Sequence, residues 1–157
     1  MLSHLNKENQ PTMVNVGKKA ITRRMARAQA IVQLSPEITA EFDGAELQSK
    51  KGPVFQTAIL AGICAAKKTS DLIPLCHPLP LDDCQVSLKL DSKTHQVTIE
   101  AVASVEAKTG IEMEALTAVS VAALTLYDMC KALSHRIQIL NIRLLEKTGG
   151  KKDYLAD

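Results

Sequence analysis

The sequence predicts a single α+β domain of the ferredoxin-like type, in which an antiparallel sheet carries helices on one face in the order βαββαβ. Segments with an apolar residue at every second position, typical of half-buried strands, alternate with segments of helical spacing. No internal repeat competes with that order, and 157 residues suit one hydrophobic core. We also expect an oligomer, because a core with two Phe, two Tyr and no Trp buries little area per residue.

The first half of the chain predicts one strand and two helices after a flexible lead-in. Residues 1–20 are polar and unpatterned, so they have little ability to bury surface. Small or apolar residues alternate with mostly polar ones over 24–34, which predicts the first strand. Ser35 precedes a proline and is expected to cap a short helix that Gly44 closes. A second helix should begin near Pro53 and end at two lysines.

The second half predicts a hairpin, a long helix and a final strand. Alternation over 84–90 and again over 97–105, with a polar link between them, predicts the hairpin. A capping box of sequence TGIE predicts a helix from about residue 110 to about residue 134. Apolar residues over 137–145 predict the last strand.

These elements divide the chain into three parts. Residues 1–20 form the flexible lead-in, and residues 21–147 form the ferredoxin-like domain. Residues 148–157, rich in Gly and Lys, are expected to be a mobile tail.

Composition argues against several classes of function. A net charge of +2 with two Phe and two Tyr supplies neither the basic surface nor the stacking platforms of a nucleic-acid-binding protein. The uncharged run 115–127 is shorter than the roughly 20 apolar residues of a membrane span, so we expect no membrane contact. Four cysteines without a C-x-x-C pair, and an N-terminus without an apolar signal sequence, favour a cytoplasmic protein.

The helix predicted over 110–134 has an apolar or small middle on all sides, whereas the surface helix of a monomer shows a polar stripe. We therefore expect it to be buried between subunits. At 100° per residue, Glu114, Asp128 and Lys131 fall on one stripe of this helix. Asp128 and Lys131 have the spacing of a surface ion pair. Alternatively, their apolar neighbours partly desolvate them, and a lysine in such a place can reach a catalytic pKa.

Two other segments have the chemistry to meet a ligand. His77 lies in a proline-bounded loop and is a candidate ligand contact, although an exposed loop histidine often has no task. Cys76 beside it lacks partners at metal-ligand spacing, so we predict no metal site. Lys50 and Lys51 precede a helix N-terminus, which favours an anion such as phosphate, but a solvated basic turn has the same composition. These residues alone indicate an anion-binding cleft and no particular reaction.

Five segments are specific enough to identify a family. The longest are DLIPLCHPL at 71–79 and TGIEMEAL at 109–116, followed by YDMCKA at 127–132. The other two are KG with VF at 51–55 and AGI through AAK at 61–67. These segments resemble the MoaC family of molybdenum-cofactor biosynthesis, and the resemblance covers nearly everything from 13 to 151.

The resemblance implies a fold, an assembly and a reaction. The fold is ferredoxin-like, and the assembly is a homohexamer built as a trimer of dimers with active sites at the dimer interface. The enzyme, a phosphorus–oxygen lyase named cyclic pyranopterin monophosphate synthase, converts (8S)-3',8-cyclo-7,8-dihydroguanosine 5'-triphosphate into cyclic pyranopterin monophosphate and diphosphate. No resident cofactor is expected, and whether Mg²⁺ accompanies the triphosphate stays open. The alternative is a non-catalytic nucleotide-binding oligomer of the same fold.

The resemblance also implies roles for single residues. Lys51 and Lys131 would be acid/base lysines that lower each other's pKa in a shared cleft, and Asp128 would be the catalytic carboxylate. Three cations would hold phosphates: Arg24, Lys67 and Lys147. Six residues would line the substrate pocket: Leu75, Cys76, His77, Glu112, Met113 and Glu114.

Four positions depart from the family pattern. Asn15, Pro53 and Ser70 stand where the family usually has Asp, an acidic residue and Trp, and Lys152 replaces a smaller residue. None of them is a proposed catalytic position, so the departures concern the tail and the start of the second helix.

Overall fold

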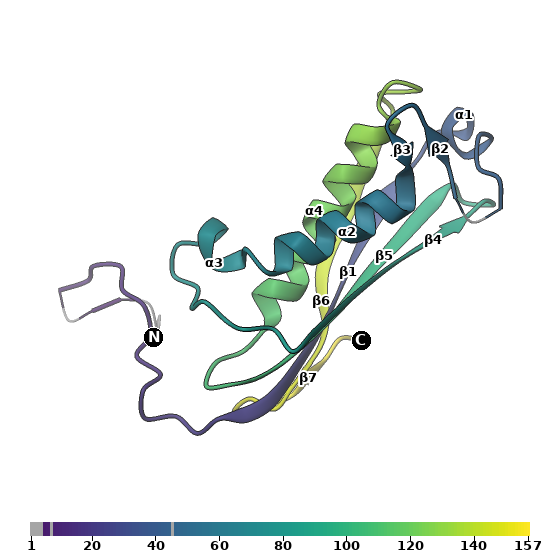
Figure 1. Ribbon diagram of the computed structural model, residues 1–157. Coiled ribbons are helices and arrows are strands. Elements are labelled where there is room, and N and C mark those ends of the chain that lie inside the picture. The colour runs from purple at the N-terminus through teal and green to yellow at the C-terminus, as the bar shows by residue number, and fades with distance from the viewer. Residues whose placement is uncertain (1–4, 7, 45) are drawn as a thin grey trace.

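The computed structural model describes residues 5–6, 8–44 and 46–157 (Figure 1). Within these residues the main sheet has the strand order β4-β5-β1-β6-β7, and all its neighbours pair antiparallel. The strands of this sheet are β1 (Thr22–Gln33), β4 (Asp83–Asp91), β5 (Gln96–Ala107), β6 (Gln138–Thr148) and β7 (Tyr154–Leu155). A separate two-stranded hairpin consists of β2 (Gln48–Ser49) and β3 (Gly52–Pro53).

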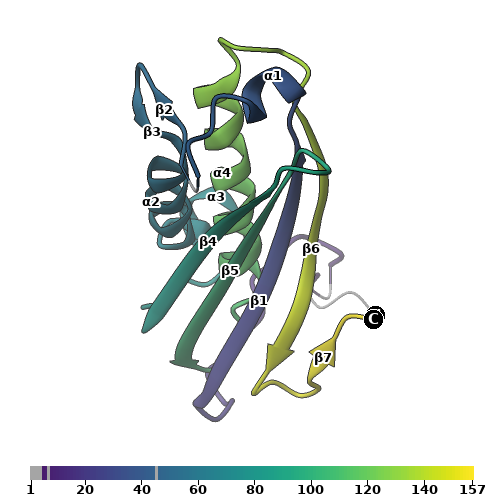
Figure 2. The same cartoon turned by 90° about the vertical axis from the view of Figure 1, so that its right-hand side faces the viewer.

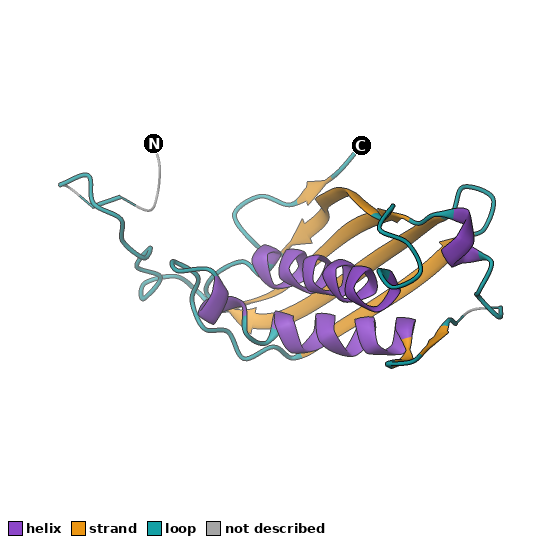
Figure 3. Ribbon diagram, turned by 90° about the horizontal axis from the view of Figure 1, so that it is seen from above, coloured by secondary structure: helices purple, strands orange, loops and turns teal. Residues whose placement is uncertain are grey.

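Two long helices cover one face of the sheet. They are α2 (Val54–Ala66) and α4 (Glu112–Cys130), and the short helices are α1 (Pro36–Thr39) and α3 (Thr69–Leu72). Figure 2 shows α4 over β1 and β5, with α2 beside it on the β4 side, and Figure 3 shows both helices from above. The order β1, α2, β4, β5, α4, β6 confirms the predicted α+β class with the βαββαβ arrangement.

The core lies between this sheet face and the two helices. Ala26, Ala28 and Ala30 of β1 are fully buried, whereas the residues between them face the open side of the sheet. The same alternation on β5 buries every second residue from Val97 to Ala107. Small residues dominate this core, which allows α4 to lie close to the strands.

The helix caps differ from the prediction. Ser35 makes no side-chain cap hydrogen bond within the described chain. Its carbonyl oxygen instead accepts from the backbone N–H groups of Ile38 and Thr39, so the first turn closes through the backbone. The helix has four residues and ends before the segment that Gly44 was expected to close.

The predicted capping box is also absent from the described start of α4, where Ile111 is the N-cap and makes no side-chain cap hydrogen bond. The carboxylate of Glu112 turns away to Lys147 of β6, 2.8 Å distant. At the other end, the N–H of Leu133 bonds to the carbonyl of Cys130 in a tight turn. The helix is therefore shorter at both ends than the range 110–134 predicted.

The apolar middle of α4 is largely explained within one chain. Its length and hydropathy would suffice for a membrane span, but a core helix passes the same test. Residues facing α2 and the sheet, such as Ala118, Ala122 and Leu126, are fully buried. Leu124 points outward and is 59% exposed, so only this outer side of the helix is not covered within the chain.

The two ends of the chain are placed differently from a simple lead-in and tail. Residues 1–4 and 7 of the predicted lead-in lie outside the described residues. The lead-in is tied to the body of the domain where Lys108 Nζ donates to the Gly17 carbonyl, 2.8 Å. The tail folds back, and β7 pairs with Glu146 and Lys147 of β6. Flexibility of the lead-in and mobility of the tail stay predictions.

Candidate functional site

A lysine–aspartate cluster lies where α4 ends. Lys51 Nζ is 2.7 Å from Asp128 Oδ2, and Lys131 Nζ is 2.7 Å from Asp128 Oδ1. Lys51 Nζ also donates to the Asp128 carbonyl oxygen, 3.3 Å. One carboxylate thus holds two ammonium groups, and the structure brings together the three residues predicted to act on protons.

Local structure explains how Lys51 reaches the helix. It lies in the turn between β2 and β3, directly before α2, and Gly52 follows it with φ 109°, a backbone conformation that favours glycine. The hydroxyl of Ser49 accepts from the Lys51 N–H and donates to the Gly52 carbonyl, which closes this turn. In Figure 1 the β2–β3 hairpin stands beside the C-terminal end of α4.

The electrostatics of the cluster differ from the expectation. The hydrogen bond from Lys131, and next that from Lys51, lower the pKa of Asp128 to about 2. The same hydrogen bond with Asp128 raises the pKa of Lys131, which is the opposite direction to the one expected for this lysine. The side chain of Asp128 is 51% exposed, so the cluster is an open ion-pair network. It borders a cavity of about 520 Å³.

A second group of residues lies where α4 begins. There, a cavity of about 540 Å³, here called the loop cavity, lies between the 75–79 loop, the first turn of α4 and β6. Its lining includes all six predicted pocket residues and one predicted phosphate holder: Leu75, Cys76, His77, Glu112, Met113, Glu114 and Lys147. These residues span 73 positions from the first to the last but converge on one cavity.

The pKa values of two carboxyl groups of the loop cavity are shifted in opposite directions. Glu114 is 3% exposed, and burial, followed by the charge of Glu112, raises its pKa. For Glu112 burial opposes ionisation, but the hydrogen bond from Lys147, its own backbone N–H and the charge of Arg24 together lower its pKa. Burial and the nearby Glu114 raise the pKa of the Cys76 thiol. The cavity therefore places a carboxyl group whose pKa is raised beside one whose pKa is lowered.

A basic cavity of about 390 Å³ adjoins the loop cavity. Five cations line it: Lys19, Arg24, Lys147, Lys151 and Lys152. Glu112 is the acidic residue among the described lining residues, and Lys147 already neutralises it. Sequence reasoning missed Lys19, Lys151 and Lys152, because nothing in their spacing showed that the segments just before β1 and just after β6 lie beside the start of α4.

Lys67 lies apart from these groups. It is exposed just after α2 and borders a different cavity with Leu79, Asp82 and Asp83. Leu79 is the residue that this cavity has in common with the described lining of the loop cavity. Within one chain, Lys67 therefore lies next to the predicted substrate pocket and does not line it.

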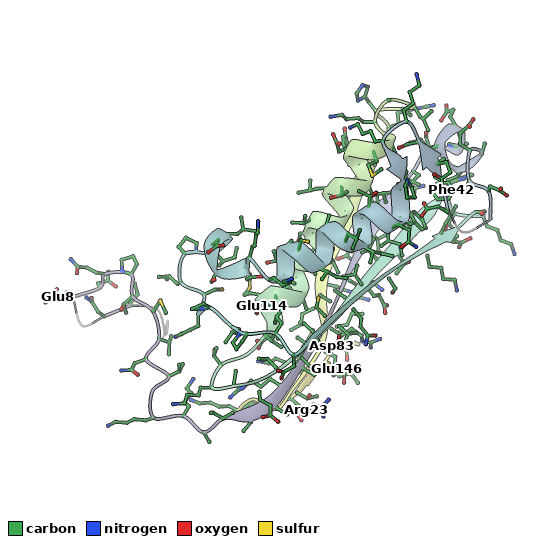
Figure 4. The ribbon with its side chains drawn as sticks, viewed as in Figure 1. Glu8, Arg23, Phe42, Asp83, Glu114 and Glu146 are labelled. Atoms are coloured by element: carbon green, nitrogen blue, oxygen red, sulfur yellow. The ribbon has the colours of Figure 1, made fainter. Side chains whose placement is uncertain are left out.

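Glu114 and Asp128 have different surroundings, although the helical wheel places them on one stripe of α4. Glu114 is buried near the N-terminal end of α4 (Figure 4), whereas Asp128 is half exposed at the other end. The 75–79 loop lies against the first turns of the helix, whereas the β2–β3 hairpin beside the last turn leaves the Asp128 side chain half exposed. Fourteen residues at 1.5 Å each separate Glu114 from Asp128 by about 21 Å along the axis.

The described residues contain no group of three or more His, Cys, Asp or Glu side chains placed to hold a metal ion.

The family model named MoaC family matches residues 13–150. The chain belongs to the MoaC family. The match includes every residue predicted to be catalytic or to line the substrate pocket, and it ends before Lys151.

This MoaC-family chain is also similar to a longer relative. It is 48% identical over 156 residues to the "Molybdenum cofactor biosynthesis bifunctional protein" of Synechocystis sp.. That alignment covers 98% of the chain but 45% of the relative, so the chain spans about half the length of the relative it matches.

Proposed function

We propose that the chain acts in molybdenum-cofactor biosynthesis and converts (8S)-3',8-cyclo-7,8-dihydroguanosine 5'-triphosphate into cyclic pyranopterin monophosphate and diphosphate. Membership of the MoaC family supports the pathway, as does the name of the Synechocystis relative. The observation that carries the proposal is the cluster in which Asp128 lies 2.7 Å from both Lys51 and Lys131.

The cluster suits a reaction with several proton transfers. Opening the purine-derived ring and closing a pterin ring each require protons to be added and removed at nitrogen and oxygen. Asp128 stays ionised at neutral pH and keeps Lys131 protonated in the free protein. Lys131 would therefore act first as an acid. Loss of the contact with Asp128, or burial by substrate, would lower the pKa of Lys131 and ease release of this proton, and the neutral amine would then accept a proton in a later step.

The opposite end of α4 suits the triphosphate. Phosphate oxygens bind best to several cations and to backbone N–H groups at a helix N-terminus, and both occur around Arg24 and Lys147 at the start of α4. Release of diphosphate requires positive charge on its oxygens as the bond to the remaining phosphate breaks. We therefore propose that the diphosphate leaves from the basic cavity.

The distance between the two ends implies a second subunit. About 21 Å along α4 is too far for one substrate molecule to keep its ring at Asp128 and its phosphates at Arg24 of the same chain. A twofold axis across the exposed side of α4 would place the end of one helix beside the start of the other. The apolar exposure of Leu124, Leu140 and Ile142 on α4 and β6 supports such a contact.

We accordingly propose a homohexamer built as a trimer of such dimers, with each active site at a dimer interface. We propose no resident cofactor, and Mg²⁺ would enter only with the triphosphate. All four cysteines are free thiols, which agrees with a reducing cytoplasm as the place of action.

Mass spectrometry tests the proposed reaction. The purified protein is incubated with the cyclised nucleotide, and products are compared with those of Lys51→Ala, which loses one member of the cluster. Lys68→Ala, an exposed lysine outside the cavities described here, is the matched control. We expect a pterin monophosphate and diphosphate from the parent and the control, and unchanged nucleotide from Lys51→Ala. Unchanged nucleotide with the parent protein, bound but not converted, would favour the non-catalytic alternative.

A further inference from the structure

The end of the chain returns to the sheet beside the basic cavity. Tyr154 and Leu155 form β7 and pair with Lys147 and Glu146 of β6 (Figure 2). The N–H of Ala156 then donates to the carbonyl oxygen of Leu145, 2.7 Å. These bonds attach residues 154–156 to β6, a few residues after that strand has ended.

The segment between β6 and β7 is closed at its base. The backbone N–H of Gly149 donates to the Asp153 carboxylate, 3.1 Å, and the Gly149 carbonyl accepts from the Thr22 hydroxyl, 2.8 Å. Gly149 has φ 80°, and a Cβ there would overlap the backbone of Arg23 on β1. A glycine is therefore required for the turn to lie against the start of β1.

Lys151 and Lys152 lie inside this closed turn and line the basic cavity with Arg24 and Lys147. A lysine on a free tail loses chain and side-chain entropy when it binds an anion. A lysine on a closed turn has already lost the backbone part, so less of the binding free energy is spent on ordering.

We propose that residues 153–156, here called the C-terminal clip, are a positioning element that holds Lys151 and Lys152 over the basic cavity for the terminal phosphates of a nucleoside triphosphate. The proposal rests on the proposed function for the identity of the nucleotide. The anion site itself is defined by the cations of the cavity. The clip touches no substrate atom and acts through the two lysines.

Binding of inorganic tripolyphosphate, measured by calorimetry on the full chain, tests the clip without any turnover. We expect Lys151→Ala with Lys152→Ala to weaken binding about tenfold or more, as for the loss of charge-assisted contacts. Asp153→Ala opens the turn and should weaken binding at least about threefold. Ala156→Pro removes the N–H that bonds to Leu145 and should act in the same direction.

The sign of the Asp153 effect separates positioning from simple electrostatics. Removing a carboxylate near bound phosphates should strengthen binding by Coulomb attraction alone, whereas positioning predicts that it weakens. Asp157→Ala removes the same charge from the tail without a described hydrogen bond and is the matched control, so we expect binding as tight as in the parent or tighter. Circular dichroism and the thermal midpoint verify that each variant is folded.

Combining the changes gives the decisive comparison. If the clip acts through the lysines, Asp153→Ala should have almost no further effect once Lys151 and Lys152 are alanine. Losses that multiply, or an Asp153→Ala protein that binds like the parent, would overturn the proposal. Failure of the proposed reaction would look different: tripolyphosphate binding and its dependence on Asp153 would persist while no pterin forms.

Discussion

Asp128 bridges two lysines through different oxygens, and this geometry determines which protons the site can move first. Its pKa of about 2 keeps it ionised at any physiological pH. The Asp128 carboxylate is the counter-charge of both lysines. An arginine guanidinium in place of either lysine would pair with this carboxylate equally well. Charge and proton transfer can therefore be separated by experiment at Lys51 and Lys131.

Lys51→Arg should preserve substrate binding but lose most of the turnover. A guanidinium keeps the charge and binds phosphate and carboxylate, but it cannot release a proton near neutral pH. Loss of one positioned acid or base typically lowers the rate about 10²–10⁴-fold. Single-turnover kinetics with a separate binding measurement will check this, and Lys131→Arg should behave alike. Turnover within a few-fold of the parent would assign Lys51 to charge stabilisation alone.

Glu114 predicts a dependence of stability on pH. Burial raises its pKa in the folded protein above the ordinary value of 4.5, so the folded state holds its proton to higher pH than the unfolded state does. The contribution of Glu114 to folding stability therefore falls as pH rises from 4.5 through the folded-state pKa. Glu114→Gln should remove this slope and raise the free energy of unfolding at neutral pH, measured by urea denaturation at several pH values. An unchanged slope would mean that the pKa of Glu114 is the same in the folded and the unfolded protein.

At the scale of elements, α2 and α4 approach closely because α2 has a glycine at the contact. A Cβ on Gly62 would lie 2.9 Å from the Ala118 carbonyl oxygen and 3.3 Å from both Ala122 Cβ and Val86 Cγ2. The carbonyl belongs to the α4 backbone and cannot move independently of the helix. The spacing of the two helices on the sheet is thus set at this point.

Gly62→Ala should therefore destabilise the domain, although alanine is the better helix former. We expect a loss of about 1–3 kcal/mol in the free energy of unfolding, typical of overpacking. Leu60→Ala on the same helix is the control, because Leu60 is 63% exposed and both residues favour helix. Denaturant titration will compare the three proteins. A Gly62→Ala protein as stable as the control would show that the helices separate without strain.

At the scale of the whole molecule, the proposed site needs two chains. One protomer presents the lysine–aspartate cluster at one end of α4 and the loop cavity at the other. A protein that is a stable monomer by light scattering and has full activity in the assay would contradict a shared site. The exposed apolar side chains between the two ends, Leu124 above all, are the surface on which this expectation depends.

Subunit mixing tests the shared site directly. Asp128→Ala disables the cluster and His77→Ala disables the loop cavity, so each protein alone should have little activity. A mixed dimer would contain one intact site and one doubly altered site. Equal, random mixing should therefore restore about a quarter of the parental activity.

The control for this mixing experiment is Asp128→Ala with Lys51→Ala. Both residues lie in the same cluster, so no mixed dimer would contain an intact site and no activity should return. If Asp128→Ala with His77→Ala also stays inactive after subunit exchange, the two clusters do not meet between chains.

The sequence by itself determined the fold class and the positions of its main elements. Alternation of small apolar and polar residues placed β1, β4 and β5 within a few residues of their observed bounds, because the period of two is a local property of the strand. The helix ends were less predictable. Ser35 and Glu112 have cap chemistry, but Ser35 makes no side-chain cap hydrogen bond and Glu112 pairs with Lys147.

Only the tertiary structure decided how the functional residues divide. Lys51 and Asp128 are 77 positions apart, and no spacing rule predicts their contact; the family resemblance grouped them without showing the geometry. The helical wheel put Glu114 and Asp128 on one stripe, yet the 75–79 loop buries the first and leaves the second open. The sequence likewise did not show that the segments just before β1 and just after β6 meet at the cavity that Arg24 and Lys147 line. Burial and long-range contacts depend on which segments pack together, and local periodicity carries no information about that.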